Sequence, residues 1–88
     1  MEDKAIVETV NAALGREFEL APQLLVPEAD IRKDLGLDSL DMVDMVIVLE
    51  KAFQFKLKDR EALAKIGTLG DIYDLIASLR DAGTIDKN

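Results

Sequence analysis

The sequence contains no cysteine, no histidine and no tryptophan. Without cysteine, the chain forms no disulfide framework and supplies no thiol nucleophile of its own. Without histidine, it lacks the commonest general base and the commonest metal ligand, which argues against zinc-dependent chemistry and against histidine-based catalytic triads. Aromatic side chains are limited to three Phe and one Tyr, so we expect an aliphatic core.

Proline is scarce and long apolar runs are missing. The 88 residues are 49% hydrophobic, which predicts one packed domain spanning residues 1–88. The longest uninterrupted apolar run covers residues 45–49, far short of the roughly 20 residues that cross a bilayer. Residues 1–4 show no signal-peptide pattern. We therefore predict a cytoplasmic protein with no membrane span.

Acidic residues outnumber basic ones by 18 to 11, and the net charge of −7 is unevenly distributed. Residues 1–50 contain twelve acidic and four basic residues (net −8), whereas residues 51–88 contain six and seven (net +1). The overall sign disfavours binding to nucleic acid. The acidic half is typical of a protein whose partners have basic surfaces, although acidic residues also simply keep a small domain soluble.

Apolar periodicity predicts helices throughout the chain and no strand. A long connection over residues 16–37, which contains both prolines, separates the first two helices. Asp59 is a candidate N-cap for a short third helix, and Thr68 with Asp71 resembles a capping box before the last helix. The sequence thus predicts an all-α fold, a small four-helix bundle with three longer helices and one short one, over residues 3–14, 39–53, 60–65 and 69–81.

The helix predicted over residues 39–53 has apolar residues on two faces at 100° per residue. One face, which can pack into the core, comprises Met42, Met45, Val46, Leu49 and Phe53. The nearly opposite stripe, edged by Asp41, Asp44 and Glu50, comprises Leu40, Val43 and Ile47. An exposed apolar stripe edged by carboxylates is typical of a docking surface. The alternative is that the 16–37 connection covers this stripe.

Ser39 opens the same helix, directly after Asp38, a favourable N-cap residue. The unpaired N–H groups and the positive end of the helix dipole would stabilise a phosphodiester attached there by about 0.3–1 kcal/mol. A serine beside an aspartate at a helix start commonly serves only in capping. The position alone therefore leaves both capping and covalent modification open.

The run Leu-Gly-Leu-Asp-Ser-Leu-Asp-Met-Val-Asp-Met-Val over residues 35–46 resembles the signature of the acyl carrier protein family. Residues 66–72 are similar to that family as well, so the resemblance covers nearly the whole chain. It implies a non-enzymatic carrier whose 4′-phosphopantetheine is moved by a phosphopantetheinyl transferase from coenzyme A to the Ser39 hydroxyl. The thiol of this arm then holds acyl groups as thioesters, so the cofactor supplies the sulfur that the sequence lacks.

The resemblance also implies roles for further residues, none of them as metal ligands. Asp38 and Leu40 flank the attachment site. Partners with basic docking surfaces, including acyl-transfer and ketosynthase-type enzymes, would contact Asp38, Leu40, Asp41, Val43, Asp44, Ile47 and Glu50. The acyl chain would fold into a cleft lined by Val46, Leu49, Leu57, Ala62 and Ile66. These cleft positions are equally those of an ordinary core.

Residues 51–65 depart from the resemblance, because they are rich in lysine and arginine where the family is usually acidic. We therefore expect a specialised carrier that serves a dedicated fatty acid, lipid or polyketide-type pathway. A monomer is expected as well, since a shuttle visits many partners.

Two alternatives to an acyl carrier stay open. One is a peptidyl or D-alanyl carrier with the same arm, and the other is a helical adaptor that binds partners through Leu40, Val43 and Ile47 without an arm.

Overall fold

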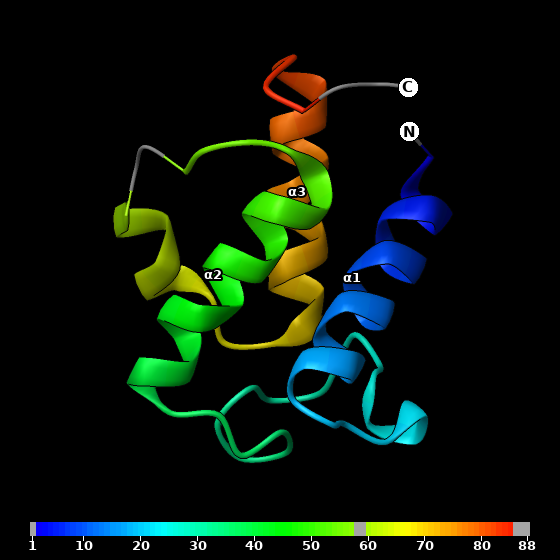
Figure 1. The fold of residues 1–88 in the computed structure, drawn as a ribbon, viewed down its shortest axis with the longest axis vertical. Helices are drawn as coiled ribbons and strands as arrows, with labels where there is room; N and C mark the ends of the chain where they lie inside the picture. The colour runs from blue at the N-terminus through cyan, green and yellow to red at the C-terminus, as the bar shows by residue number, and fades with distance from the viewer. Residues whose placement is uncertain (1, 58–59, 86–88) are drawn as a thin grey trace.

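The computed structural model describes residues 2–57 and 60–85, and every secondary-structure element within them is helical. In chain order these are α1 (Asp3–Glu17), the 3-10 helix η1 (Pro22–Leu24), α2 (Ser39–Phe53), the 3-10 helix η2 (Arg60–Lys65) and α3 (Leu69–Asp81). α1 packs against both α2 and α3. The connection between α1 and α2 runs across the end of the bundle at which α1 ends and α2 and α3 begin (Figure 1). The all-α prediction is confirmed.

The number of α-helices differs from the prediction. Residues 60–65, predicted as a short additional helix, form the 3-10 helix η2, so the described residues contain three α-helices and two 3-10 helices. A segment this short gains few hydrogen bonds for the residues it fixes, and short helical pieces commonly adopt the tighter 3-10 pattern. Asp59, the predicted cap of this segment, lies outside the described residues.

α1 continues to Glu17, whereas the sequence predicted an end near residue 14 with Gly15 as its terminator. Glu19 adopts the left-handed conformation (φ 54°), and the N–H of Leu20 donates to the carbonyl of Gly15 at 3.0 Å. This is a Schellman-type helix end in which Glu19 takes the place usually filled by glycine. Gly15 instead marks a close contact, since a Cβ there would lie 3.2 Å from Leu25 Cδ1.

The three α-helices and the connection enclose an aliphatic core, as the few aromatic residues predict. The main buried cluster consists of Ile6, Val10, Leu14, Ala29, Ile31, Leu35, Leu37, Met45, Leu49, Phe53, Phe55, Leu69, Ile72, Tyr73, Ile76 and Ile85. Tyr73 brings a polar group into it: its hydroxyl donates to Asn11 Oδ1, and burial raises its pKa. The core face predicted for α2 is confirmed, except that Met42 is only half-buried.

Backbone hydrogen bonds hold the connection between α1 and α2 against the start of α3. Three of them join residues 27–31 to residues 67–70, with N···O distances of 2.9–3.0 Å. Asp30 and Thr68 form an isolated antiparallel bridge within this pairing. Ile31 is 1% exposed and anchors the segment in the core. The long connection therefore follows a defined path, which fixes the position of the residues that precede α2.

The predicted capping box at the start of α3 is confirmed. Thr68 Oγ1 accepts a hydrogen bond from the N–H of Asp71 at 3.2 Å. Asp71 Oδ2 accepts in return from the N–H groups of Gly67 and Thr68, at 2.9 and 3.0 Å. These two donors, Gly67 first, hold the pKa of Asp71 below its ordinary value. The box also fixes Gly67 and Thr68, which pair with the connection.

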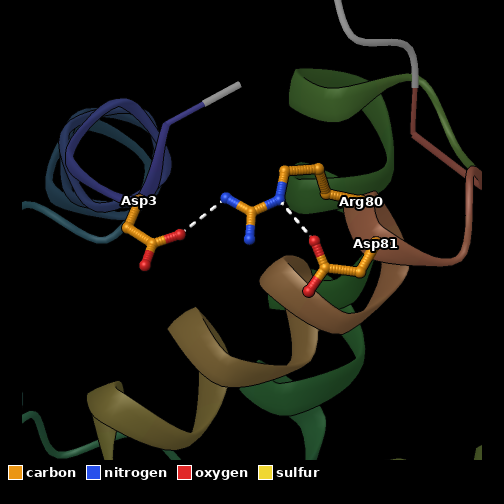
Figure 2. Close-up of polar contacts among 3 residues, drawn as sticks. All are labelled: Asp3, Arg80 and Asp81. Carbon is orange, nitrogen blue, oxygen red and sulfur yellow. Dashed lines mark hydrogen bonds and ion pairs between the residues drawn. The ribbon is translucent and has the colours of Figure 1, made fainter.

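At the opposite end of the bundle, Arg80 joins α3 to α1 (Figure 2). Its Nη1 lies 2.6 Å from Asp3 Oδ1, and its Nε lies 2.9 Å from Asp81 Oδ1. Asp81 and then Asp3 raise the pKa of Arg80 further. The two carboxylates are exposed, and exposed ion pairs add little to stability. We therefore attribute the packing of α3 on α1 to the core and not to this bridge.

Thr68→Ala should lower the free energy of unfolding by about 1 kcal/mol, because it removes the acceptor that caps α3. Urea unfolding followed by circular dichroism measures this change. Thr84→Ala, which alters an exposed threonine outside the helices, is the matched control and should change stability by less than about 0.5 kcal/mol. Equal effects of the two substitutions would contradict the capping role of Thr68.

Candidate functional site

α2 begins with a capping box built from two aspartates. Asp38 Oδ1 accepts from the N–H of Asp41 at 3.0 Å, and Asp41 Oδ2 accepts from the N–H of Asp38 at 3.1 Å. The N-cap predicted at Asp38 is confirmed. Asp41, which is predicted to contact partners, also accepts a hydrogen bond that stabilises the start of α2. The N–H of Asp41 and, to a lesser extent, that of Leu40 hold the pKa of Asp38 below its ordinary value.

Ser39 is the first residue of α2 and is exposed. Because the Asp38 carboxylate makes the cap, α2 does not need the Ser39 hydroxyl to begin. Ser39 Oγ accepts a hydrogen bond from Arg32 Nη2 at 3.4 Å. The cap therefore belongs to Asp38, and the Ser39 hydroxyl is presented at the surface beside a guanidinium.

An open pocket of about 380 Å³ adjoins Ser39. Its walls come from α2, η2, the turn before α2 and the segment between η2 and α3. They comprise Asp30, Ile31, Arg32, Ser39, Met42, Val43, Leu63, Ala64, Ile66 and Gly67. We name it the Ser39 pocket. Six of the ten lining residues are apolar and come from α2, η2, the turn before α2 and the segment between η2 and α3, while Asp30 and Arg32 add charged groups.

The residues predicted to line an acyl cleft are not gathered around one cavity in the described structure. Ile66 lines the Ser39 pocket. Val46 and Leu49 are each 3% exposed, and Leu49 belongs to the main core cluster. Leu57 is half-buried against that core, and Ala62 lines a different pocket of about 280 Å³ between η2 and α3, which Ile66 lines as well. The cleft therefore stays a prediction.

The second apolar face of α2 is exposed. Leu40, Val43 and Ile47, which we name the α2 stripe, are 77%, 44% and 41% exposed. The alternative that the 16–37 connection covers this face is therefore wrong. The connection packs instead against the start of α3. Asp44 is exposed as well and, at helical spacing, lies at the edge of the stripe.

Two other acids at the edges of the α2 stripe bind backbone groups. Asp41 completes the capping box, and Glu50 Oε2 accepts from the N–H of Leu57 at 2.8 Å. Both acids are half-buried. Asp44, by contrast, is exposed and forms no hydrogen bond or ion pair with the described residues. The predicted partner-binding acids thus differ in whether their carboxylates already accept hydrogen bonds from backbone N–H groups of the described residues.

Arg32 is the site residue that sequence reasoning missed. It precedes Ser39 by seven residues, in a turn without helical periodicity, so no spacing rule connects the two. The available signal was a basic residue shortly before an acidic helix. Only the folded path of the turn shows that its side chain reaches the Ser39 hydroxyl.

Within residues 2–57 and 60–85, no helix combines the length and the apolar character that crossing a bilayer requires. The same residues contain no group of three or more carboxylates close enough to hold a metal ion.

The sequence is similar to carrier proteins over most of its length. Residues 5–76 match the family model described as "Phosphopantetheine attachment site". The chain is 37% identical to an acyl carrier protein of Thermosynechococcus vestitus over 76 residues, 86% of this chain and 93% of that protein. It is 34% identical to an acyl carrier protein of Saccharopolyspora erythraea over 91 residues (99% and 95%). It is 39% identical to one from Syntrophobacter fumaroxidans over 77 residues (88% and 89%).

Asp38→Ala should lower the melting temperature at pH 7, because it removes the cap of α2. Folding lowers the pKa of Asp38 from 3.8, so the cap stabilises fully above that pH and is lost as the pH falls through the folded-state pKa. Wild type and variant should therefore converge in acid. Thermal unfolding over a pH series tests this, with Asp44→Ala as the control on the same helix. A wild-type advantage that does not change with pH would argue against the cap.

Proposed function

We propose that this chain, which belongs to the acyl carrier protein family, bears its 4′-phosphopantetheine on Ser39 and holds acyl groups as thioesters on that arm. Proteins of this family are carriers and not enzymes. When bound, the arm supplies the reactive thiol. The observation that carries the proposal is the exposed Ser39 hydroxyl at the first position of α2, which the Asp38 cap leaves outside the helix hydrogen bonds.

The residues around Ser39 suit a phosphodiester. The hydroxyl is exposed, so a phosphopantetheinyl transferase can reach it. The helix N-terminus favours an attached anion by about 0.3–1 kcal/mol, and the Arg32 guanidinium lies against the same oxygen. The nearby carboxylates of Asp38 and Asp41 accept hydrogen bonds from backbone N–H groups, and these bonds stabilise their negative charge within the capping box.

We further propose that the α2 stripe and its acidic edge dock the transferase and the acyl-transfer and ketosynthase-type enzymes that follow it. The apolar residues would be buried against the partner, while basic partner residues would face Asp38, Asp41, Asp44 and Glu50. The net charge of −8 over residues 1–50 supports steering toward basic surfaces. In this proposal the shuttle is a monomeric domain of residues 1–88 that works in the cytoplasm.

For the acyl chain, we propose a cleft reached through the Ser39 pocket and lined by Val46, Leu49, Leu57, Ala62 and Ile66. Val46 and Leu49 are buried, so the bundle would have to open to admit an acyl chain. The Ser39 pocket has walls from both α2 and η2, so we propose that η2 moves away from α2. η2 is a short 3-10 helix, and such segments open at a lower free energy than packed α-helices. In this proposal η2 is the movable wall of the bundle.

The carrier is proposed to serve a dedicated fatty acid, lipid or polyketide-type pathway. Lys51, Lys56 and Lys65 are exposed, and Lys51 and Lys56 line a pocket together with Ile47 and Glu50, so basic groups adjoin the acidic face there. An enzyme whose surface is basic throughout would be repelled there. A peptidyl or D-alanyl carrier would use the same serine, and the enzyme that loads the holo protein distinguishes these carriers from an acyl carrier.

Incubation with coenzyme A, magnesium and a broad-specificity phosphopantetheinyl transferase should raise the intact mass by about 340 Da, the mass of the arm. Ser39→Ala should gain no mass, because it lacks the acceptor hydroxyl. Ser78→Ala removes the exposed serine on α3, the other serine of the chain, and should be modified fully. Modification of Ser39→Ala would overturn the proposed site. A wild type that no transferase modifies would favour the arm-free adaptor.

The holo protein should be acylated at least about tenfold more efficiently, in kcat/KM, by an acyl-transfer enzyme of a dedicated pathway than by general fatty acid synthase enzymes. This difference corresponds to about 1.4 kcal/mol. Combining Lys51→Glu with Lys56→Glu should reduce this difference in kcat/KM, because the general enzymes should recognise the variant better. Lys4→Glu on α1 should leave the difference unchanged. Equal efficiency of the wild type with both kinds of enzyme would show that the carrier is not specialised.

A further inference from the structure

Arg32 places a cation at the Ser39 hydroxyl. Its Nη2 donates to Ser39 Oγ at 3.4 Å, and both residues line the Ser39 pocket. The bond is long for an N–H···O contact, so it adds little by itself. A phosphorus atom bonded to the same Oγ would carry its charged oxygens one bond further out. The planar guanidinium, with its fork of N–H donors, matches such oxygens.

The turn that carries Arg32 is held by its own hydrogen bonds. Asp30 Oδ1 accepts from the N–H groups of Arg32 and Lys33, at 2.9 and 2.8 Å. Ile31 is buried, and its N–H bonds to the segment before α3. The backbone of Arg32 therefore has a fixed position relative to Ser39. Only the side chain has to be ordered when it binds an anion, which lowers the entropy cost of binding.

The other charged residues that line the Ser39 pocket or cap α2 are negative. Asp30 lines the same pocket, and Asp38 and Asp41 form the cap directly beside Ser39. Among the described residues, no carboxylate forms an ion pair with Arg32, although its charge helps to lower the pKa of the nearby Asp38. A phosphodiester on Ser39 would add one more negative charge to this group of acids. Arg32 is the cation positioned to offset it.

We propose that Arg32 binds the phosphodiester of the arm on Ser39 and directs the start of the arm toward the Ser39 pocket. The inference rests on the proposed function, since it requires Ser39 to be the attachment residue. Arg32 acts as a positioning residue: its guanidinium donates to the nonbridging phosphate oxygens and forms no covalent bond. Lysine at this position would supply a point charge without the paired donors.

The test compares Arg32→Gln with Lys33→Gln, which removes the same charge one residue further along, from a side chain without a contact to Ser39. Each protein is converted to the holo form, checked by intact mass, and its melting temperature is compared with that of its own apo form. In the wild type and in Lys33→Gln, the holo form should melt at the same temperature as the apo form or at a higher one. In Arg32→Gln it should lower the melting temperature by about 2–5 °C, and by less in 1 M salt.

A second measurement reports on the phosphate directly. The ³¹P resonance of the holo protein should shift in Arg32→Gln, stay in place in Lys33→Gln, and shift less in Arg32→Lys. In the melting experiment each holo form is compared with its own apo form, so a general loss of stability in Arg32→Gln cancels. Equal responses of Arg32→Gln and Lys33→Gln would overturn the role of Arg32 while the mass gain on Ser39 stands. A wild type without any mass gain would instead overturn the proposed function, and this inference with it.

Discussion

The site depends on the backbone pairing between residues 27–31 and residues 67–70. Closing a long connection costs conformational entropy, although the cost grows only slowly with length. The hydrogen bonds of this pairing and the burial of Ile31 offset that cost and fasten the middle of the connection to the segment that starts α3. From Ile31 only a short path remains to α2. This path brings the Arg32 side chain to the Ser39 hydroxyl.

α2 and α3 start at the same end of the bundle (Figure 1). Each of them begins with a capping box. In each, the carboxylate of an aspartate at the third helical position accepts a hydrogen bond from the backbone N–H of the residue that caps the helix. The reciprocal bonds satisfy N–H groups that the first turn would otherwise leave unpaired. Asp41 and Asp71 are therefore structural as well as acidic. The net charge of −7 therefore includes carboxylates that already accept hydrogen bonds within the chain, whereas Asp44 accepts none from the described residues.

Ser39 lies at the border between the two apolar faces of α2. At 100° per residue it falls between Val46 on the core side and Val43 on the α2 stripe. Val43 both lines the Ser39 pocket and is 44% exposed, so the pocket and the stripe are continuous at this residue. A group attached to Ser39 can thus turn toward a partner on the stripe or toward the pocket. A single helix presents the hydroxyl, the proposed docking surface and one wall of the pocket.

Residue order alone determined the bounds and caps of α2 and α3 and the presence of two apolar faces on α2, whereas the folded path of the connection decided that the α2 stripe is exposed. Capping and amphipathic periodicity act over a few residues, so they can be read without knowing the fold. Tertiary structure decided that α1 passes through Gly15, that residues 60–65 form a 3-10 helix, and that four of the five predicted cleft residues lie away from the Ser39 pocket. It also decided that Arg32 meets Ser39. These features depend on contacts between segments far apart in sequence, which arise only when the connection packs against α3.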